Sequence, residues 1–204
     1  MAFIPTISNE AVASLEPARF DGKIVVVDTA EALASACADI ATHTEVGFDT
    51  ETRPSFTAGI TNKVALMQLS VGDVCYLIRL NRLPLDKALL AILQNPAIKK
   101  VGAAVQNDIQ RLGELRHFKA AGFVDLQNEV GRFGIEDRSL RKLSGIILGK
   151  KVSKAQRLSN WEAHTLTPQQ QVYAATDAWV CVEILHALER AAAEQPKRQT
   201  PHKE

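Results

Sequence analysis

The sequence predicts an α/β protein with one mixed β-sheet flanked by α-helices. Two strand-like segments, residues 63–71 and 74–79, are separated by Gly72-Asp73, the two-residue pattern of a β-hairpin. After this hairpin, short apolar segments alternate with longer helical ones. The chain has 204 residues, of which 46% are hydrophobic and 23% charged, and these values suit a single globular domain.

Each expected element has its own signal. Residues 23–28 (KIVVVD) predict a strand, and Thr29 caps an Ala-rich helix that runs to about residue 42. The strand at 46–51 comes before the hairpin, and Pro84 opens a helix that ends before Asn95-Pro96. The remaining expected elements are strands at 98–102 and 123–126 and helices at 105–115, 126–133, 139–148 and 167–193. The last of these helices opens with Thr167-Pro168-Gln169-Gln170, a capping box with proline at its first position.

Three regions are expected along the chain. Residues 1–20 predict an extended N-terminal lead-in, residues 21–193 a single folded domain, and residues 194–204 a flexible polar tail.

Composition gives further expectations. A net charge of +1 indicates no global attraction to nucleic acid or to a membrane, so a charged binding site must come from local clustering. The N-terminus shows no basic stretch followed by an apolar one, so we expect no secretory leader. No uninterrupted run of 18 apolar residues occurs, so we expect no membrane span. The three cysteines, Cys37, Cys75 and Cys181, are widely separated, which argues against a disulfide framework and suits the cytoplasm.

Two acidic residues stand at the end of a predicted central strand. Asp49 and Glu51 lie in VGFDTETRPSF with one threonine between them. Alternate residues of a strand point to the same face, so their carboxylates are expected side by side, roughly 6.5–7 Å apart along the strand. A solvated strand end is the simplest interpretation of such a pair, and a ligand pair is the alternative.

Two further acids occupy unusual positions. Asp108 stands where a buried strand turns into a helix, the edge at which α/β sheets build their sites. Asp177 lies on the apolar stripe of the last helix, one turn after Tyr173, and a carboxylate there needs a partner. If the four acids converge, cations must offset their repulsion, and oxygen ligands without His or Cys favour Mg²⁺ or Mn²⁺.

These residues resemble a known family. FDTETRP, QNDIQRL and YAATDAW are similar in order and separation to the three exonuclease motifs of the DEDD superfamily. Tyr173 stands four residues before Asp177, which resembles the DEDDy branch that contains ribonuclease D and the Werner-syndrome exonuclease domain. The resemblance covers roughly residues 20–192, includes the segment 148–179, and implies an RNase H-like sheet. Ribonuclease D carries helical domains after its exonuclease, and this sequence ends before any such region.

The resemblance implies a 3′–5′ exonuclease domain that releases nucleoside 5′-monophosphates with two divalent cations, Mg²⁺ or Mn²⁺. It implies that Asp49 bridges both ions, that Glu51 and Asp177 complete the site of one, and that Asp108 holds the other. Tyr173 is then expected to orient the attacking water. Gln68 and Asn107 are candidates for groups that support these ligands without contacting the cations.

A basic segment follows the second motif. The segment 138–157 contains seven basic residues and no acid: Arg138, Arg141, Lys142, Lys150, Lys151, Lys154 and Arg157. It is either a phosphate-contacting strip or an ordinary solvated surface, and Lys150, Lys151, Lys154 and Arg157 are the expected nucleic-acid contacts. Trp161 either stacks on a base or packs in the core.

Two other functions remain open on the sequence. One is a nucleic-acid-binding module that keeps the fold without turnover, and the other is an endonuclease or integrase of the wider RNase H-like group. The choice of DNA or RNA is open as well, because the cations contact phosphate and the terminal 3′ oxygen.

Overall fold

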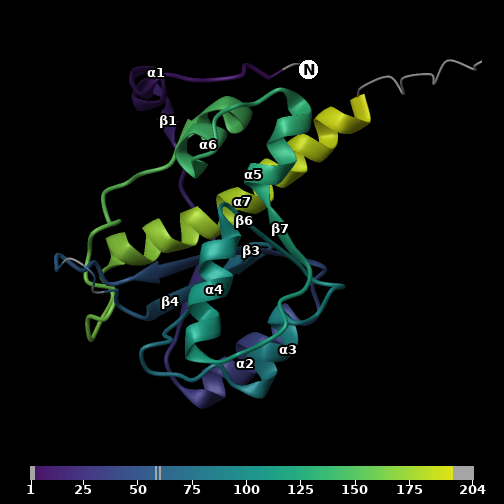
Figure 1. The fold of residues 1–204 in the computed structure, drawn as a ribbon. Coiled ribbons are helices and arrows are strands. Elements are labelled where there is room, and N and C mark those ends of the chain that lie inside the picture. The colour runs from purple at the N-terminus through teal and green to yellow at the C-terminus, as the bar shows by residue number, and fades with distance from the viewer. Residues whose placement is uncertain (1–2, 58, 60, 195–204) are drawn as a thin grey trace, which may run out of the picture.

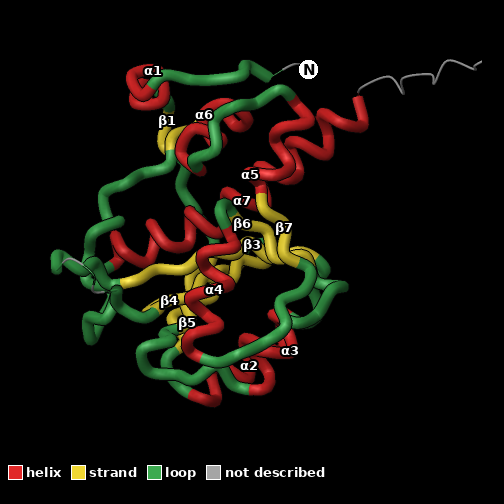
Figure 2. The backbone as a smooth tube through the Cα atoms, viewed as in Figure 1, coloured by secondary structure: helices red, strands yellow, loops and turns green. Residues whose placement is uncertain are grey.

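A six-stranded mixed sheet forms the centre of the protein (Figures 1 and 2). The structure is a computed structural model that describes residues 3–57, 59 and 61–194. The strands lie in the order β2-β5-β4-β3-β6-β7, and β4 runs antiparallel to both of its neighbours while the other pairs are parallel. Their bounds are β2 Lys23–Val27, β3 Glu45–Thr52, β4 Val64–Val71, β5 Val74–Ile78, β6 Lys99–Gly102 and β7 Phe123–Asp125. The predicted α/β class is confirmed.

Helices cover both faces of this sheet. Val46 and Phe48 of β3 point to the apolar cluster that contains the helices α2 (Ala30–Ile40), α3 (Lys87–Leu93) and α4 (Val105–Leu115). The opposite face packs against α7 (Pro168–Glu194), the 27-residue helix that crosses the centre of Figure 1. The short helices α5 (Leu126–Glu129), η1 (Val130–Phe133) and α6 (Leu140–Leu148) share a second apolar cluster with α7.

The expected turns and caps are present with small shifts. Gly72 adopts a left-handed φ of 53° in the turn between β4 and β5, as the hairpin requires. The capping box of α7 is formed, since Gln170 N–H donates to Thr167 Oγ1 (3.2 Å) and Thr167 N–H to Gln170 Oε1 (3.0 Å). Helix α3 begins at Lys87 and not at Pro84, because Asp86 is its N-cap and accepts from the Leu89 N–H.

The prediction that residues 1–20 form an extended lead-in is wrong in its central part. Residues Asn9–Ser14 form helix α1, capped by Ser8, and Val12 of this helix is fully buried against Gly145 of α6. The next residues form β1 (Glu16–Pro17), which pairs in parallel with β8 (Lys150–Lys151). The lead-in therefore contributes to the core beside α6, where Figure 1 shows it.

The C-terminal end of the last helix also differs from the predicted domain boundary, by one residue. Residue Glu194 belongs to α7 and not to the expected tail, and 195–204 lie outside the described residues. Cys37, Cys75 and Cys181 are buried free thiols. Among the helices of the described residues, none is long and apolar enough to span a membrane.

Candidate active site

Strand β3 presents two acids to α7. Gly47, Asp49 and Glu51 alternate along the strand, so their side-chain positions share one face. A Cβ added at Gly47 would lie 2.1 Å from the carbonyl oxygen of Ala178, so that face points to α7. Because residue 47 is glycine, the backbones of β3 and α7 approach far more closely here than any side chain permits.

This close approach brings a third acid to the pair. Asp177 precedes Ala178 in α7 and is 6% exposed, whereas Asp49 and Glu51 are partly buried. One carboxylate oxygen from each of Asp49, Glu51 and Asp177 lies within 4.8 Å of the others. The three acids, which we call the acid cluster, thus converge as the sequence predicts.

Asp108 lies beside the acid cluster but belongs to a third element, helix α4. It stands in the first turn of α4, and its carboxylate accepts a hydrogen bond from the hydroxyl of Thr50. The side chain of Thr50 points away from the face that Asp49 and Glu51 share, and it fixes the fourth acid. The negative charge of Asp108 still contributes to raising the pKa of both Asp49 and Glu51.

An unusual backbone conformation places Asp108. Ala104, which precedes α4, has a left-handed φ of 62°, the one positive φ among the described non-glycine residues. Its N–H donates to Asp125 Oδ1 (3.0 Å), and the same oxygen accepts from Gln127 N–H to cap α5. One carboxylate therefore fixes the start of both helices, and this holds the first turn of α4 against the end of β3.

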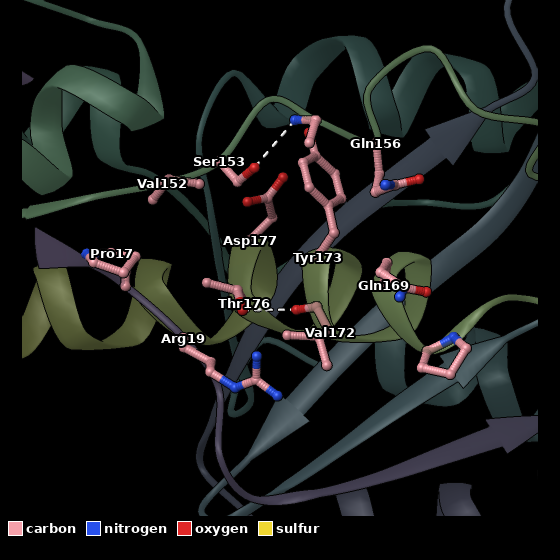
Figure 3. A pocket seen from close by; sticks show the side chains of 13 residues that line it. Pro17, Arg19, Val152, Ser153, Gln156, Gln169, Val172, Tyr173, Thr176 and Asp177 are labelled. Atoms are coloured by element: carbon pink, nitrogen blue, oxygen red, sulfur yellow. Dashed lines mark hydrogen bonds between the residues drawn. The ribbon is translucent and has the colours of Figure 1, made fainter. Parts of the chain in front are cut away.

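Tyr173 and Asp177 project from the same side of α7 toward the loop at Ser153 (Figure 3). The phenol of Tyr173 lies one helical turn from the Asp177 carboxylate, close enough for each group to shift the pKa of the other. The ring of Tyr173 packs on Trp161, with centroids 6.0 Å apart. Tyr173 and Asp177 line a pocket of about 420 Å³ between α7, the 152–156 loop and the segment Pro17–Arg19. Trp161 does not reach the pocket, because it is buried in the core, where it supports the ring of Tyr173.

Trp161 does not stack on a base, which corrects one expected nucleic-acid contact. Its side chain is fully buried with Leu66, Leu77 and Leu166. The core-packing alternative is the one the structure supports, and the contribution of Trp161 to the site is to support the ring of Tyr173.

Burial disfavours the charged form of every acid here, and repulsion from the other acids adds to this for Asp49 and Glu51. Burial is the largest cause in each case, and it raises the pKa of Glu51 to about 10, of Asp177 to about 7 and of Asp108 to about 6. The pKa of Asp49 is also raised well above its ordinary value, by burial and then by Asp177 and Asp108. Without cations, the acid cluster therefore holds protons near neutral pH.

Only some of the basic residues in the segment 138–157 are free to contact phosphate. Lys150, Lys154 and Arg157 are exposed, whereas Lys151 Nζ donates to the Ala13 carbonyl (2.8 Å). Lys142 pairs with Asp137 (2.8 Å), and the guanidinium groups of Arg138 and Arg141 bond to neighbouring segments. Within the part of the chain that the structure describes, neither Lys154 nor Arg157 forms an ion pair.

Relatives with known names match most of this chain. It is 35% identical over 152 residues to the mouse bifunctional 3′-5′ exonuclease/ATP-dependent helicase WRN, an alignment covering 70% of this chain and 11% of that protein. It is 37% identical over 158 residues to exonuclease 3′-5′ domain-containing protein 2 of Drosophila melanogaster, covering 74% and 26%. The chain thus spans about a tenth to a quarter of the length of these relatives.

Solved structures share the fold. The Nibbler EXO domain of Aedes aegypti superposes with a TM-score of 0.74 at 27% identity, over 83% of this chain and 88% of that one. Ribonuclease D of Escherichia coli superposes with a TM-score of 0.73 at 23% identity, over 84% and 47%, and confirms the RNase H-like sheet. The model of the 3′-5′ exonuclease family matches residues 24–192, which include all four acids and Tyr173. The chain therefore belongs to the 3′-5′ exonuclease family.

Proposed function

We propose that this protein is a metal-dependent 3′–5′ exonuclease of the DEDDy type that releases nucleoside 5′-monophosphates. The observation that carries the proposal is the acid cluster, in which oxygens of Asp49, Glu51 and Asp177 lie within 4.8 Å of one another. Membership of the 3′-5′ exonuclease family indicates the reaction class, and the acid cluster provides carboxylate ligands for the cations that the reaction needs.

The donor set suits two hard divalent cations, Mg²⁺ or Mn²⁺. All the donors are carboxylate oxygens, and Asp177 Oδ1 is buried with no hydrogen-bonding partner. The buried cationic groups of Arg79 and Lys100 donate to backbone carbonyls elsewhere, so they do not neutralise the cluster. When bound, the cations stabilise the charge on the attacking and leaving oxygens of the phosphodiester.

Each acid has a proposed role that follows from its place. Asp49 belongs to the cluster, and the charges of both Asp177 and Asp108 act on it, so it is the ligand that would contact both cations. Glu51 of β3 and Asp177 of α7 would hold one cation together with Asp49. Asp108 of α4, whose carboxylate the Thr50 hydroxyl keeps in place, would help to hold the second.

Tyr173 acts as a hydrogen-bond donor. Burial, followed by the charges of Asp177 and Glu51, raises the pKa of its phenol, so the hydroxyl stays protonated at neutral pH. A protonated phenol cannot serve as general base, but it can orient an attacking water beside Asp177. The packing of Tyr173 on Trp161 limits the freedom of the ring and so fixes the direction of the hydroxyl.

Nucleic acid is the proposed substrate, with the exposed Lys150, Lys154 and Arg157 as phosphate contacts. The 152–156 loop forms one wall of the pocket that Tyr173 and Asp177 line. Lys154 of this loop lines a neighbouring cavity together with Arg141 and Lys151. Another cavity, of about 520 Å³, runs along α4 from Asn107 to Glu114, and Arg111 lines it. A trypanosomal ribonuclease D of 19% identity has been solved with a U12 RNA, which supports nucleic acid as the ligand class.

The test is a cleavage assay on 5′-labelled DNA and RNA, single- and double-stranded, with Mg²⁺ or Mn²⁺. We expect stepwise shortening from the 3′ end in the wild type, and at least a 100-fold loss in Asp49→Asn and Asp177→Asn. Asp73→Asn is the matched control, because it makes the same chemical change in the exposed β4–β5 turn. Undiminished activity in both site variants would end the proposal.

The same assay separates the two alternatives. A binding module without turnover would bind the labelled strands and leave them intact with either metal. An endonuclease would cut a circular single strand, which a 3′–5′ exonuclease leaves whole.

A further inference from the structure

Gln68 occupies the centre of the sheet directly opposite an acid of the cluster. It lies in β4, is fully buried, and pairs with Asp49 in the antiparallel β3–β4 register. Directly opposite residues of such a pair share one face, with Cβ atoms about 4.5–5.5 Å apart. The side chain of Gln68 therefore lies on the α7 side of the sheet, within reach of the Asp49 carboxylate.

The amide of Gln68 has no partner that explains its burial. Neither Nε2 nor Oε1 forms a hydrogen bond, and a buried polar group left unpaired costs about 1–3 kcal/mol. Two of its neighbours on the same face are apolar, Leu66 two residues away on β4 and Leu77 opposite it on β5. A leucine or methionine at this position would pack without that cost, so the fold alone does not account for a glutamine.

The neighbouring acids provide the reason. Asp49 accepts one hydrogen bond, from the Thr50 N–H to Oδ1, and Asp177 Oδ1 has none. A lysine beside them would neutralise the cluster and compete with a cation, and a glutamate would add to the repulsion. A glutamine amide offers an N–H donor without a charge, which suits a carboxylate that must stay ionised to bind a metal.

We propose that Gln68 is a positioning residue for the metal site: when the cations are bound, its amide N–H, which has no partner in the present structure, would donate to the Asp49 carboxylate and hold it in the orientation that binds the cations. This rests on the proposed function in so far as the acid cluster binds divalent cations. It goes beyond that function by assigning a role to a residue that contacts neither the substrate nor the metal.

The test compares Gln68→Met, which keeps the size and removes the donor, with Ser70→Ala as the matched control. Ser70 is buried on the same strand and face, and it lies opposite Gly47, where no acid stands. The measurements are Mn²⁺ affinity by calorimetry, the melting midpoint in metal-free buffer, and the rate of cleavage across a Mn²⁺ titration.

For Gln68→Met we expect a Mn²⁺ affinity about 10–100-fold weaker and a metal-free midpoint equal to or above that of the wild type. Cleavage should be lost at low Mn²⁺ and should return at saturating Mn²⁺, which a merely structural role would not produce. Ser70→Ala should keep its Mn²⁺ affinity within twofold. A Gln68→Met affinity within twofold of the wild type would overturn the assignment.

Two further outcomes keep the assignment separate from the proposed function. If the wild type binds Mn²⁺ but cleaves nothing, a weaker affinity in Gln68→Met still supports the positioning role while the exonuclease proposal fails. If the wild type binds no Mn²⁺, the positioning role fails. Should Gln68→Met not fold, Gln68→Glu replaces it: the added charge should lower the metal-free midpoint and enlarge its rise with Mn²⁺, and a rise equal to that of the wild type would contradict the proposal.

Discussion

Replacing Gly47 by alanine tests whether the close approach of β3 and α7 builds the acid cluster. The new Cβ would lie 2.1 Å from the Ala178 carbonyl oxygen and 2.8 Å from its carbon, where ordinary contact begins at 3.4 Å. Both opposing atoms are backbone, so no side chain can turn aside. The strand and the helix must separate by about 1 Å or more to accept one methyl group.

Two consequences follow from that separation. Overpacking of this kind costs about 1–3 kcal/mol, and a backbone clash in a rigid helix places Gly47→Ala near the upper end of that range. Because Asp177 is the residue before Ala178, it moves away from Asp49 and Glu51 as the helix retreats. A misplacement of about 1 Å at a reaction centre lowers rates by about 100-fold.

Denaturant unfolding in metal-free buffer measures the first effect, and cleavage of a labelled oligonucleotide at saturating Mg²⁺ measures the second. Gly113→Ala is the control, because a Cβ there meets nothing within 4 Å inside helix α4. It should raise the free energy of unfolding by about 0.5–1 kcal/mol and leave cleavage unchanged. Wild-type stability and activity in Gly47→Ala would refute the geometric reasoning.

Three other predictions concern the acids, the loop and the core. Burial raises the pKa of Asp177 from 3.8 to about 7, so between these values the folded state keeps a proton that the unfolded state releases. The metal-free protein should therefore lose stability as the pH rises from 4 to 7. Melting midpoints in EDTA measure this, and a midpoint that rises over this range, or a slope that Asp177→Asn does not flatten, would contradict it. Lys154→Ala with Arg157→Ala should weaken single-strand binding and reduce the magnitude of the slope of log affinity against log salt by about 1.4 without changing the melting midpoint, and an unchanged slope would exclude both residues as phosphate contacts. Trp161→Ala should cost about 3–5 kcal/mol in denaturant unfolding, and a specific loss of binding without loss of stability would restore the base-stacking alternative.

The parts of the site that follow from periodicity could be predicted from the sequence. Asp49 and Glu51 share a face because strands have a period of two, and Asp177 stands out because it interrupts an apolar helical stripe. Ala104 could not be predicted, since alanine carries no signal for a left-handed φ that a distant Asp125 stabilises. The burial of Trp161 comes from packing against Leu66 and Leu77, which are distant in the sequence, and local patterns do not contain such contacts.

The acid cluster is unfavourable in the metal-free protein, and the rest of α7 explains how the fold maintains it. Beyond Asp177 the helix buries Val180, Ile184 and Leu188 completely, so its position is fixed by apolar packing and not by the acids. The helix therefore cannot relieve the repulsion by moving, and the carboxylates can reduce it by holding protons or by binding cations. A site held in this way is already close to its metal-bound arrangement, so cation binding requires little reorganisation of the protein.

This predicts that cations stabilise the protein most at a pH where the acids would otherwise be ionised, so the rise in melting midpoint on adding Mn²⁺ should be larger at pH 8 than at pH 6. An equal rise at both values would mean that the cations bind elsewhere.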